Sequence, residues 1–428
     1  MWTEAFKVRS KWEHDKAALG HSYGDPKPQT QEQNSIVKML PHRYIVLSSC
    51  ALWHLAMGLP GSVQPRANFV HPGILIDEAQ AELIRTKVSQ SAAPWAPAYT
   101  SMLAHPYASK TAPEPVSTVE CGSYSTPDVG CSDEREDAMV TYLNALAWTV
   151  TGTQAYVNKA ITFMDSWAST IKAHNNTNSP LQSAWVASTW ARAAELIRYS
   201  NAGWSAASIT KFEGMLRYVY LPLVKNGAPN YMGNWDLVMA EAAIFIGVFL
   251  DDQTVYDAGM TKFLNRVSAY IYLESDGDLP KTAPGDTTTS TQAGIVTYWQ
   301  GQSVFNVSGL SQETCRDFEH TGYGLASIGH VAETSRIQGR NLFNEETGTR
   351  LRYALEFHSK YHLGEPKPAW LCPGKTLSLY FGPVTEVSFF ALSGRLGYDM
   401  PYTEELTLNQ RPAGTNKLFV GWETLTNA

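Results

Sequence analysis

A helical pattern runs through Glu136-Asp-Ala-Met-Val-Thr-Tyr-Leu-Asn-Ala-Leu-Ala-Trp-Thr-Val-Thr151 and, after the link Gly152-Thr153, through residues 154–171. In both runs the apolar residues recur at the spacing that places them on one face of an α-helix. The short link between the runs is typical of a turn. Two amphipathic helices joined in this way pack side by side as an antiparallel hairpin.

The same pattern returns along the rest of the chain, over residues 181–199, 206–221, 235–249, 255–272, 323–337 and 347–361. Strand-like alternation is nearly absent and is confined to residues near 377–380. Consecutive helix hairpins can close into a toroid whose inner helices line a central cleft. We therefore predict an all-α protein with the (α/α) toroid architecture. The long irregular segments 110–130 and 274–309 are predicted to be loops over the cleft.

The N-terminal region differs from the rest. Residues 1–38 are polar and charged, and they precede the apolar run Ile45-Val-Leu-Ser-Ser-Cys-Ala-Leu-Trp-His-Leu-Ala-Met57 and several small residues. This order is typical of a secretory signal that starts at Met39, and a buried helix is the alternative. The run is too short for a membrane span, so we expect no stable membrane association. We predict an upstream extension without fixed structure at 1–38, a signal segment at 39–67 and a single domain at 68–428 of a secreted protein.

The cysteines agree with export from the cell. Once the signal segment and its cysteine are removed, Cys121, Cys131, Cys315 and Cys372 remain, an even number. Cys121 and Cys131 bracket a short loop and are predicted to pair with each other, which leaves Cys315 to pair with Cys372. The spacing contains neither a CxxC motif nor a Cys/His ligand pattern, so we predict no metal site.

The composition argues against nucleic acid as a partner. The formal net charge is −7 and the pI is about 5.9, whereas nucleic-acid binding favours a basic surface. Thirteen Trp and 21 Tyr are many for 428 residues. Aromatic side chains often line sugar-binding clefts, and core packing is the alternative for each of them. Two N-glycosylation sequons, at Asn175 and Asn306, are compatible with a secreted glycoprotein.

An unusual set of side chains occurs in Gln312-Glu-Thr-Cys-Arg-Asp-Phe-Glu-His-Thr-Gly-Tyr323. If this segment is helical, with about 100° between successive residues, Arg316, His320 and Tyr323 lie within roughly 60° of one another on one face. A guanidinium, an imidazole and a phenol on one stripe can bind a carboxylate and move a proton beside it. The structural alternative is that Arg316 pairs with a neighbouring carboxylate while His320 and Tyr323 belong to the core.

Asn234 stands where the helical run 235–249 opens. This position suits an N-cap, and capping alone would explain the residue. The free backbone N–H groups and the dipole of a helix N-terminus also suit an anion. The sequence therefore leaves two roles open for Asn234, the cap and the anion ligand.

Several short motifs along the chain together resemble those of a known protein family. None of these motifs identifies the family alone. They are His71-Pro-Gly, Cys121-Gly, Asp137-Ala, Ala193-Ala-Glu-Leu, Gly233-Asn-Trp, and Arg316-Asp with His320 and Tyr323. In their order and spacing, from about residue 69 to about residue 395, the chain resembles the alginate lyase-like polysaccharide lyases. The resemblance implies an incomplete (α/α) toroid that cleaves uronic-acid polymers by β-elimination. The family includes alginate lyases and glucuronan lyases.

The resemblance also implies roles for four residues. In the elimination the carboxylate of the uronate is neutralised, a base takes the C5 proton and an acid protonates the departing O4. Asn234 and Arg316 are the candidates for binding the carboxylate. His320 and Tyr323 are the candidates for base and acid, in an order left open. The family has an Asn-His pair before a Trp, and Met232 stands where that histidine is expected, which favours glucuronan or a mixed glucuronate polymer over alginate.

Further candidates are aromatic and amide side chains near these segments. The predicted substrate-binding residues are Asn230, Trp235, Trp185, Tyr298, Trp299 and Gln300. The predicted function is that of a monomeric lyase acting, without a cofactor, on an anionic polysaccharide. One alternative is a glycoside hydrolase on the same toroid, which needs two carboxylic acids across a cleft. The other is a secreted carbohydrate-binding protein that has lost catalysis.

Overall fold

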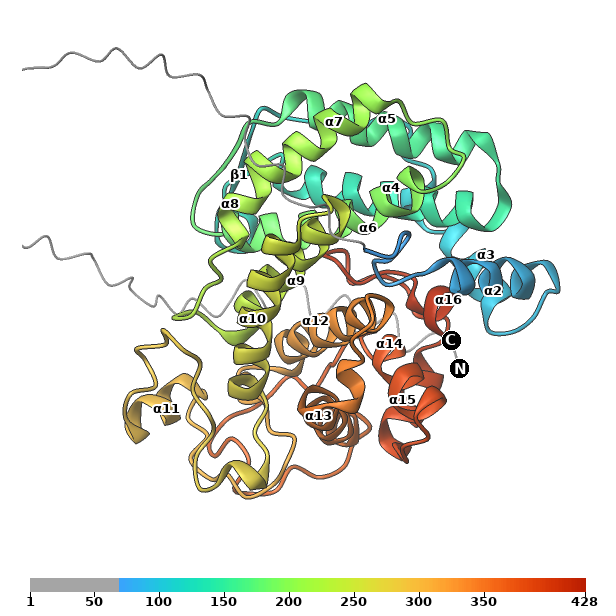
Figure 1. Ribbon diagram of the computed structural model, residues 1–428. Helices are drawn as coiled ribbons and strands as arrows, with labels where there is room; N and C mark the ends of the chain where they lie inside the picture. Colours follow the sequence, from blue (N-terminus) through green and yellow to red (C-terminus); the bar gives the residue numbers. More distant parts are fainter. Residues whose placement is uncertain (1–68) are drawn as a thin grey trace, which may run out of the picture. The chain divides into compact units, whose positions relative to one another are not determined.

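A computed structural model describes residues 69–428 of the chain (Figure 1). The predicted extension at 1–38 and the predicted signal segment at 39–67 lie outside these residues. Helices dominate the described part, and the short strands lie between α3 and α6.

The longer helices are α2 (Glu78–Ser89), α3 (Trp95–Leu103), α4 (Cys131–Thr151), α5 (Gln154–Thr170), α6 (Ser179–Arg198), α7 (Ala206–Met215), α9 (Gly233–Phe249), α10 (Gln253–Tyr270), α12 (Phe318–Ile337), α13 (Glu346–His362) and α15 (Pro401–Gln410). The shorter ones are α8 (Leu221–Val224), α11 (Gln292–Tyr298), α14 (Glu386–Phe389) and α16 (Glu423–Asn427). Short 3₁₀ and π segments are η1 (Pro106–Ala108), η2 (Ser123–Ser125), η3 (Leu216–Tyr220), η4 (Glu274–Asp276), η5 (Leu342–Asn344) and η6 (Phe390–Arg395). The strands are β1 (Thr118–Cys121), β2 (Asp128–Val129) and β3 (Ala173–Asn175).

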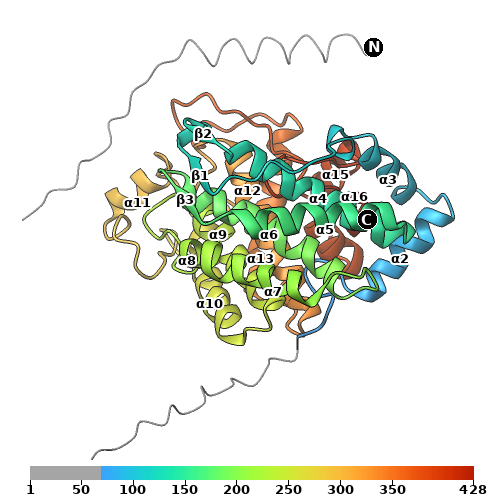
Figure 2. The ribbon, with the colours of Figure 1, turned by 90° about the horizontal axis from the view of Figure 1, so that it is seen from above.

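The long helices form a ring of hairpins. The inner helices α4, α6, α9 and α12 pack on one another in this order, and α5, α10 and α13 pack against α4, α9 and α12 from outside. Figure 1 shows the succession from α4 and α5 through α6 and α9 to α12 and α13, and Figure 2 shows α4 and α6 side by side. The predicted all-α toroid is confirmed.

The sequence decides which helices are inner. Nearly every residue of α6 is buried, and in α9 only Trp235 is not. In α5, by contrast, the buried residues form a single stripe (Val157, Ala160, Phe163, Met164 and Trp167). A helix that is apolar on all sides must be enclosed by others, whereas a helix with one apolar stripe lies at the surface.

The eight helical runs expected from the sequence are confirmed, and α4 and α12 begin five residues earlier than predicted, at Cys131 and Phe318. The strand-like signal near residues 377–380 is wrong, because these residues form no regular secondary structure. The strands present instead contain four, two and three residues. Segments of this length are too short to show the two-residue alternation by which a strand is recognised.

A small sheet stands beside the start of α4. Its strand order is β2-β1-β3, with β1 antiparallel to β2 and parallel to β3. The disulfide between Cys121 and Cys131 closes the loop that contains β2. A second disulfide joins Cys315, in the turn before α12, to Cys372, in the segment after α13. Both predicted pairings are therefore present.

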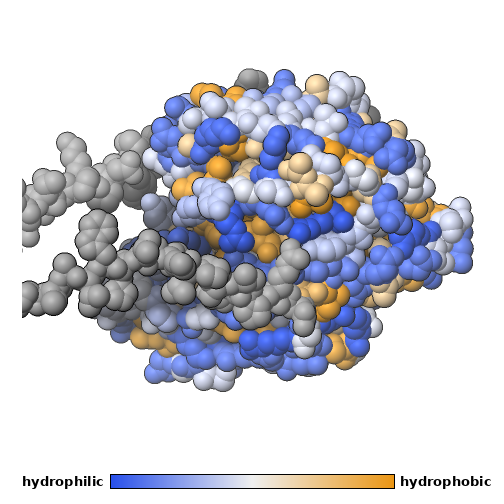
Figure 3. Space-filling model, turned by 45° about the horizontal axis from the view of Figure 1, so that its top comes forward, coloured by the Kyte–Doolittle hydropathy of each residue, from blue (hydrophilic) through white to orange (hydrophobic). Residues whose placement is uncertain are grey.

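Most apolar side chains lie in the core. On the face drawn in Figure 3, hydrophilic and hydrophobic residues are intermixed wherever the grey atoms do not cover it. Exposed large apolar residues such as Leu83, Tyr218, Tyr353 and Leu408 come from different helices. Between residues 69 and 428, no helix is long and apolar enough to cross a bilayer.

Candidate active site

A pocket of about 290 Å³ lies where the inner helices begin. It is lined by Ser123, Tyr124, Ser125, Arg135, Asn178, Leu181, Trp185, Trp235, Arg316, His320 and Leu418. The pocket therefore brings together four of the predicted site residues, Arg316, His320, Trp185 and Trp235. Its helical side chains come from the first two turns of α4, α6, α9 and α12.

The electrostatics of this place favour an anion. The N-terminus of a helix carries about half an elementary positive charge, and four such ends meet at the pocket. The guanidinium group of Arg135 adds one full charge, and Arg316 adds a second that is partly offset by the carboxylate of Glu313, 2.9 Å away. A local positive field of this kind can attract an anionic ligand even though the net charge of the chain is −7.

Asp317 determines where α12 begins. Its backbone is extended (φ −172°, ψ 164°), and its carboxylate accepts a hydrogen bond from the backbone N–H of His320 at 2.7 Å. This N-cap starts the helix at Phe318 and leaves Arg316 in the preceding turn. The predicted helical face shared by Arg316, His320 and Tyr323 is therefore wrong for Arg316.

Arg316 and His320 are nevertheless in direct contact. Nη2 of Arg316 lies 2.9 Å from Nε2 of His320. Because a guanidinium can only donate, Nε2 must be the acceptor and the ring proton sits on Nδ1. Nδ1 lies 2.8 Å from both carboxylate oxygens of Asp317 and donates to them. Burial alone would raise the pKa of Asp317, but the hydrogen bonds from His320 hold it below the ordinary value.

Behind Arg316 lies the fully buried carboxylate of Glu313. Nη1 of Arg316 donates to it at 2.9 Å, and the Tyr270 hydroxyl donates to it at 3.1 Å. Nδ2 of Asn234 lies 2.6 and 2.7 Å from its two oxygens, and the backbone N–H of Asn234 donates to it at 3.0 Å. Glu313 is thus the anion at the N-terminus of α9, and it holds Arg316 in place.

Of the two roles that the sequence leaves open for Asn234, the structure does not show the N-cap. The helix begins one residue earlier, at Gly233, and Met232 occupies the cap position. Met232 has no side-chain oxygen with which to cap, and the side chains of Gln312 and Glu313 accept from the first two N–H groups of α9 instead. Asn234 is buried and does not line the pocket.

Tyr323 lies one helical turn beyond His320, with the two ring centroids 5.3 Å apart. Its hydroxyl donates to the Glu319 carboxylate at 2.9 Å. Burial raises the pKa of Tyr323 well above that of a free phenol, and the Glu319 charge raises it further. The phenol is therefore protonated at neutral pH, and Tyr323 stands behind His320 without lining the pocket itself.

Two of the predicted substrate-binding residues form a wall of the pocket. Trp185 and Trp235 line it, and the ring of Trp235 stacks on the exposed ring of Tyr231 with centroids 4.7 Å apart. An aromatic wall of this kind is typical of a sugar-binding cleft.

The structure does not place the other predicted substrate-binding residues at this pocket. Tyr298 and Trp299 are only 5% and 2% exposed, so their rings are not available to a sugar as the prediction of substrate binding requires. The Tyr298 hydroxyl donates to a backbone carbonyl, and Trp299 packs on Phe305. Nε2 of Gln300 contacts the Met232 sulfur, and Oδ1 of Asn230 accepts from a threonine.

Several pocket residues had no assigned role in the sequence. Arg135 and Tyr124 are the most prominent of them, and both lie next to the Cys121–Cys131 disulfide. An aromatic residue within a disulfide-closed loop and an arginine one turn after its second cysteine are the signals that could have identified them. Among residues 69–428, no group of His, Cys, Asp and Glu side chains is arranged to hold a metal ion.

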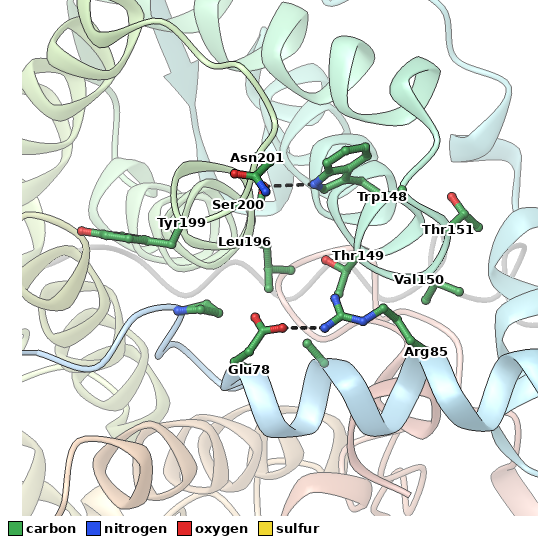
Figure 4. A pocket seen from close by; sticks show the side chains of 13 residues that line it. Glu78, Arg85, Trp148, Thr149, Val150, Thr151, Leu196, Tyr199, Ser200 and Asn201 are labelled. Carbon is green, nitrogen blue, oxygen red and sulfur yellow. Dashed lines mark hydrogen bonds and ion pairs between the residues drawn. The ribbon is translucent and has the colours of Figure 1, made fainter.

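A larger pocket, of about 780 Å³, lies at the C-terminal ends of two of these helices, α4 and α6 (Figure 4). Its lining includes Trp148 and Thr151 from the last turn of α4, Leu196 from the last turn of α6, and Ser200, which follows α6. The C-terminal ends of helices carry the negative ends of the helix dipoles. Helix α2 forms one wall of this pocket, and Figure 4 shows the ion pair between Glu78 and Arg85 on that helix. None of the predicted catalytic residues lines this pocket, and its field disfavours an anion.

The motif His71-Pro-Gly lies beside this larger pocket. Nδ1 of His71 lies 2.5 Å from the buried carboxylate of Glu195, and Nε2 lies 3.0 Å from Asp251. The imidazole also stacks on the Tyr199 ring, with centroids 4.0 Å apart. Two motifs of the resemblance, His71-Pro-Gly and Ala193-Ala-Glu-Leu, therefore meet to anchor the start of the described chain to the ends of α6 and α9.

Comparison with solved structures finds the same fold in bacterial alginate lyases. Alginate lyase A1-III from Sphingomonas species A1 matches with a TM-score of 0.53 at 14% identity, over 83% of this chain and 95% of that chain. An alginate lyase from Bacteroides ovatus matches with a TM-score of 0.55 at 13% identity, over 84% and 100%. A His-to-Ala variant of A1-III complexed with a tetrasaccharide matches with a TM-score of 0.54 at 15% identity, over 83% and 95%. No curated protein sequence matches the chain.

The toroid is the fold that this chain shares with these alginate lyases, and the family comparison makes the assignment specific. The model of the family described as Alginate lyase matches residues 102–369, more than half of the 428-residue chain. The chain belongs to the alginate lyase family and is a polysaccharide lyase.

Proposed function

We propose that this enzyme cleaves a uronic-acid polysaccharide of the glucuronan or alginate type by β-elimination. The observation that carries the proposal is the chain Asp317–His320–Arg316 at the pocket, with contacts of 2.8 and 2.9 Å. These contacts hold an oriented imidazole beside a fixed cation. In a uronate the acidic C5 proton is likewise next to the carboxylate, so the imidazole can face the proton while the guanidinium faces the carboxylate.

Arg316 binds and neutralises the uronate carboxylate. Neutralisation makes the C5 proton more acidic, because the negative charge that develops on removing it spreads onto the carboxylate. Glu313 and Asn234 set the position of the guanidinium from behind. Asn234 is therefore proposed as a positioning residue that acts through Glu313, since its amide is buried behind the pocket.

His320 takes the C5 proton. Its Nε2 carries the lone pair, because Nδ1–H donates to Asp317. In the free enzyme Arg316 donates to this nitrogen, and a bound carboxylate would take over that donor and release Nε2. Asp317 then stabilises the imidazolium that forms.

Tyr323 supplies the proton for the leaving group. As the C5–H electron pair forms the C4–C5 double bond, the C4–O4 bond breaks and O4 takes the phenolic proton. The raised pKa of Tyr323 keeps that proton in place before the reaction. One proton enters on His320 and one leaves from Tyr323, so no water is consumed and the product is a 4,5-unsaturated uronate.

Glucuronan is the preferred substrate in this proposal. Met232, which stands where the family's histidine is expected, has its sulfur in contact with Gln300 and Gln312. Among the residues that line the pocket, His320 supplies the imidazole. We also propose that the protein is a monomer and that it is secreted as a glycoprotein. Its two disulfides agree with secretion, and the exposure of both sequon asparagines, Asn175 and Asn306, agrees with glycosylation.

The proposal is tested by incubating the enzyme with glucuronan, polymannuronate, polyguluronate and hyaluronan while ultraviolet absorbance is followed. Elimination creates an absorbing conjugated uronate, hydrolysis releases reducing ends without absorbance, and a binding protein gives neither. We expect absorbance with glucuronan, and a fall of about 100-fold or more in kcat for His320→Ala and Tyr323→Phe. Tyr353→Phe, on the surface of α13, is the control and should keep the full rate.

A hydrolase is disfavoured by the surroundings of the acidic residues. Asp236 is bound to Arg266, and Glu241 is buried against His330. Asp317 and Glu319 are hydrogen-bonded to His320 and Tyr323. Each of these four carboxylates is engaged by a neighbouring side chain, so none of them stands free as one of the pair of acids that glycoside hydrolysis requires.

A further inference from the structure

Arg135 stands on the α4 wall of the pocket, and its bonding differs from that of Arg316. Nη1 donates to Oε1 of Gln182 at 2.7 Å, and Nη2 donates to the hydroxyls of Ser125 and Ser132 at 3.0 and 3.1 Å. All these acceptors are neutral. They fix the plane of the guanidinium and leave its charge without a counter-ion.

The nearby carboxylates do not supply that counter-ion. Asp128 and Glu134 lie near enough to act on the pKa of Arg135, but both accept hydrogen bonds from other side chains. Within residues 69–428, no carboxylate lies at ion-pair distance from Arg135, whereas Arg316 has Glu313 at 2.9 Å. Arg135 is partly buried, and this burial lowers the pKa of its guanidinium because it removes water from the charge. Such a charge is costly until an anion binds it.

The neighbouring loop adds a surface for a sugar ring. Tyr124 is 94% exposed and lines the same pocket next to Ser125, which holds Arg135. Its backbone is left-handed, with φ 52°, a conformation that is uncommon for a bulky residue. The Cys121–Cys131 disulfide closes this loop and limits its movement. An aromatic ring held in the open beside a cation suits a charged sugar, which stacks on the ring and pairs with the guanidinium.

We propose that Arg135 and Tyr124 form a second uronate subsite, which binds the carboxylate of the sugar next to the one held by Arg316. This inference rests on the proposed function of the pocket. Arg135 belongs to α4 and Arg316 to the turn before α12, so the two cations enter the pocket from different elements, and in this proposal each binds a carboxylate of its own. Contiguous uronates satisfy both. A polymer in which uronates alternate with neutral sugars satisfies only one, so the substrate class is a block of consecutive uronic acids.

The direct test is binding of a glucuronate tetrasaccharide, measured by titration calorimetry. Arg135→Met should weaken binding by about 10- to 100-fold, because the charge-assisted contact with the carboxylate is lost. Arg135→Lys keeps the charge and should lose less than the Met variant. Arg352→Met removes the same charge from α13 and should bind like the wild type. If Arg135→Met binds the tetrasaccharide as tightly as the wild type, the subsite does not exist.

A second measurement separates recognition from folding. The wild type should cleave glucuronan with a much higher kcat/KM than hyaluronan, whose uronates alternate with neutral sugars. Arg135→Met should raise KM for glucuronan and leave the hyaluronan rate unchanged, so the preference shrinks. An equal loss on both polymers, accompanied by a lower Tm, would show a merely structural role and overturn the inference. If the wild type gives no unsaturated product from any polymer, the proposed elimination fails, and the binding series still decides the subsite.

Discussion

At the scale of single residues, Asp317 performs two tasks with one carboxylate. It caps α12 through the backbone N–H of His320, and it accepts the Nδ1 proton of the same residue. The first task places His320 at the start of the helix, and the second selects the tautomer whose Nε2 can take a proton. The residue types in this segment predicted a carboxylate-binding and proton-transferring site. The position of His320 relative to Arg316, however, depends on the N-cap that Asp317 forms.

The two tasks can be separated by substitution. Asparagine caps a helix as well as aspartate does, so Asp317→Asn should change the free energy of unfolding little. Its amide cannot stabilise the imidazolium or select the tautomer in the same way, so kcat should fall by about 100-fold or more. Asp317→Ala is the matched variant and should also lose about 1 kcal/mol of stability. Kinetics and urea unfolding of both variants provide the measurement, and an Asp317→Asn enzyme with wild-type kcat would contradict the role of His320 as base.

Residue patterns also explain what the sequence could not predict. Arg316 and His320 are close in the chain, so their proximity was visible. Glu313 and Asn234 are 79 residues apart, and only the packing of α9 beside the turn before α12 brings them together. Tyr298 and Trp299 were expected in an open loop, but α11 and its neighbours bury them. Contacts across the ring have no local signature in a single sequence.

At the scale of elements, the inner helices give the toroid two unlike ends. Helices α4, α6, α9 and α12 all start at the smaller pocket, and α4 and α6 end at the larger one. The helical periodicity predicted the hairpins, because one apolar face per helix is a local property. The direction of the inner helices decides which pocket attracts an anion. That common direction arises only when the hairpins assemble into the toroid.

The two disulfides should affect different kinetic parameters. Cys315 directly precedes Arg316, so replacing Cys315 and Cys372 with serine should loosen the guanidinium and lower kcat. Replacing Cys121 and Cys131 with serine should loosen the Tyr124 loop and raise KM. Each change should cost about 2–4 kcal/mol of stability. Steady-state kinetics with glucuronan, alongside thermal unfolding, test this prediction, and identical kinetic effects for the two pairs would contradict it.

At the scale of the whole molecule, buried charges hold the ring together. Inside it, Nδ1 of His330 lies 3.0 Å from Glu241 of α9, and Nε2 lies 2.7 Å from Glu423 of α16. The imidazole on α12 therefore links an inner helix to the C-terminal helix. Both partners are carboxylates, so the link is strong only when the imidazole is protonated. In the sequence, Glu241, His330 and Glu423 are far apart and carry no common signal. Only the folded toroid brings these three residues into contact.

This cluster predicts a loss of stability at alkaline pH. Burial alone would lower the pKa of His330, but Glu241 and Glu423 raise it from 6.5 to about 9. Because the pKa is higher in the folded state, the stabilisation is fully present below pH 6.5 and is lost as the pH rises through 9. The loss should be on the order of 3 kcal/mol in the free energy of unfolding. Urea unfolding across this range should show the fall in the wild type and a flatter profile in His330→Gln, which is less stable but does not titrate. Parallel profiles for the two proteins would show that the link through His330 does not depend on its charge.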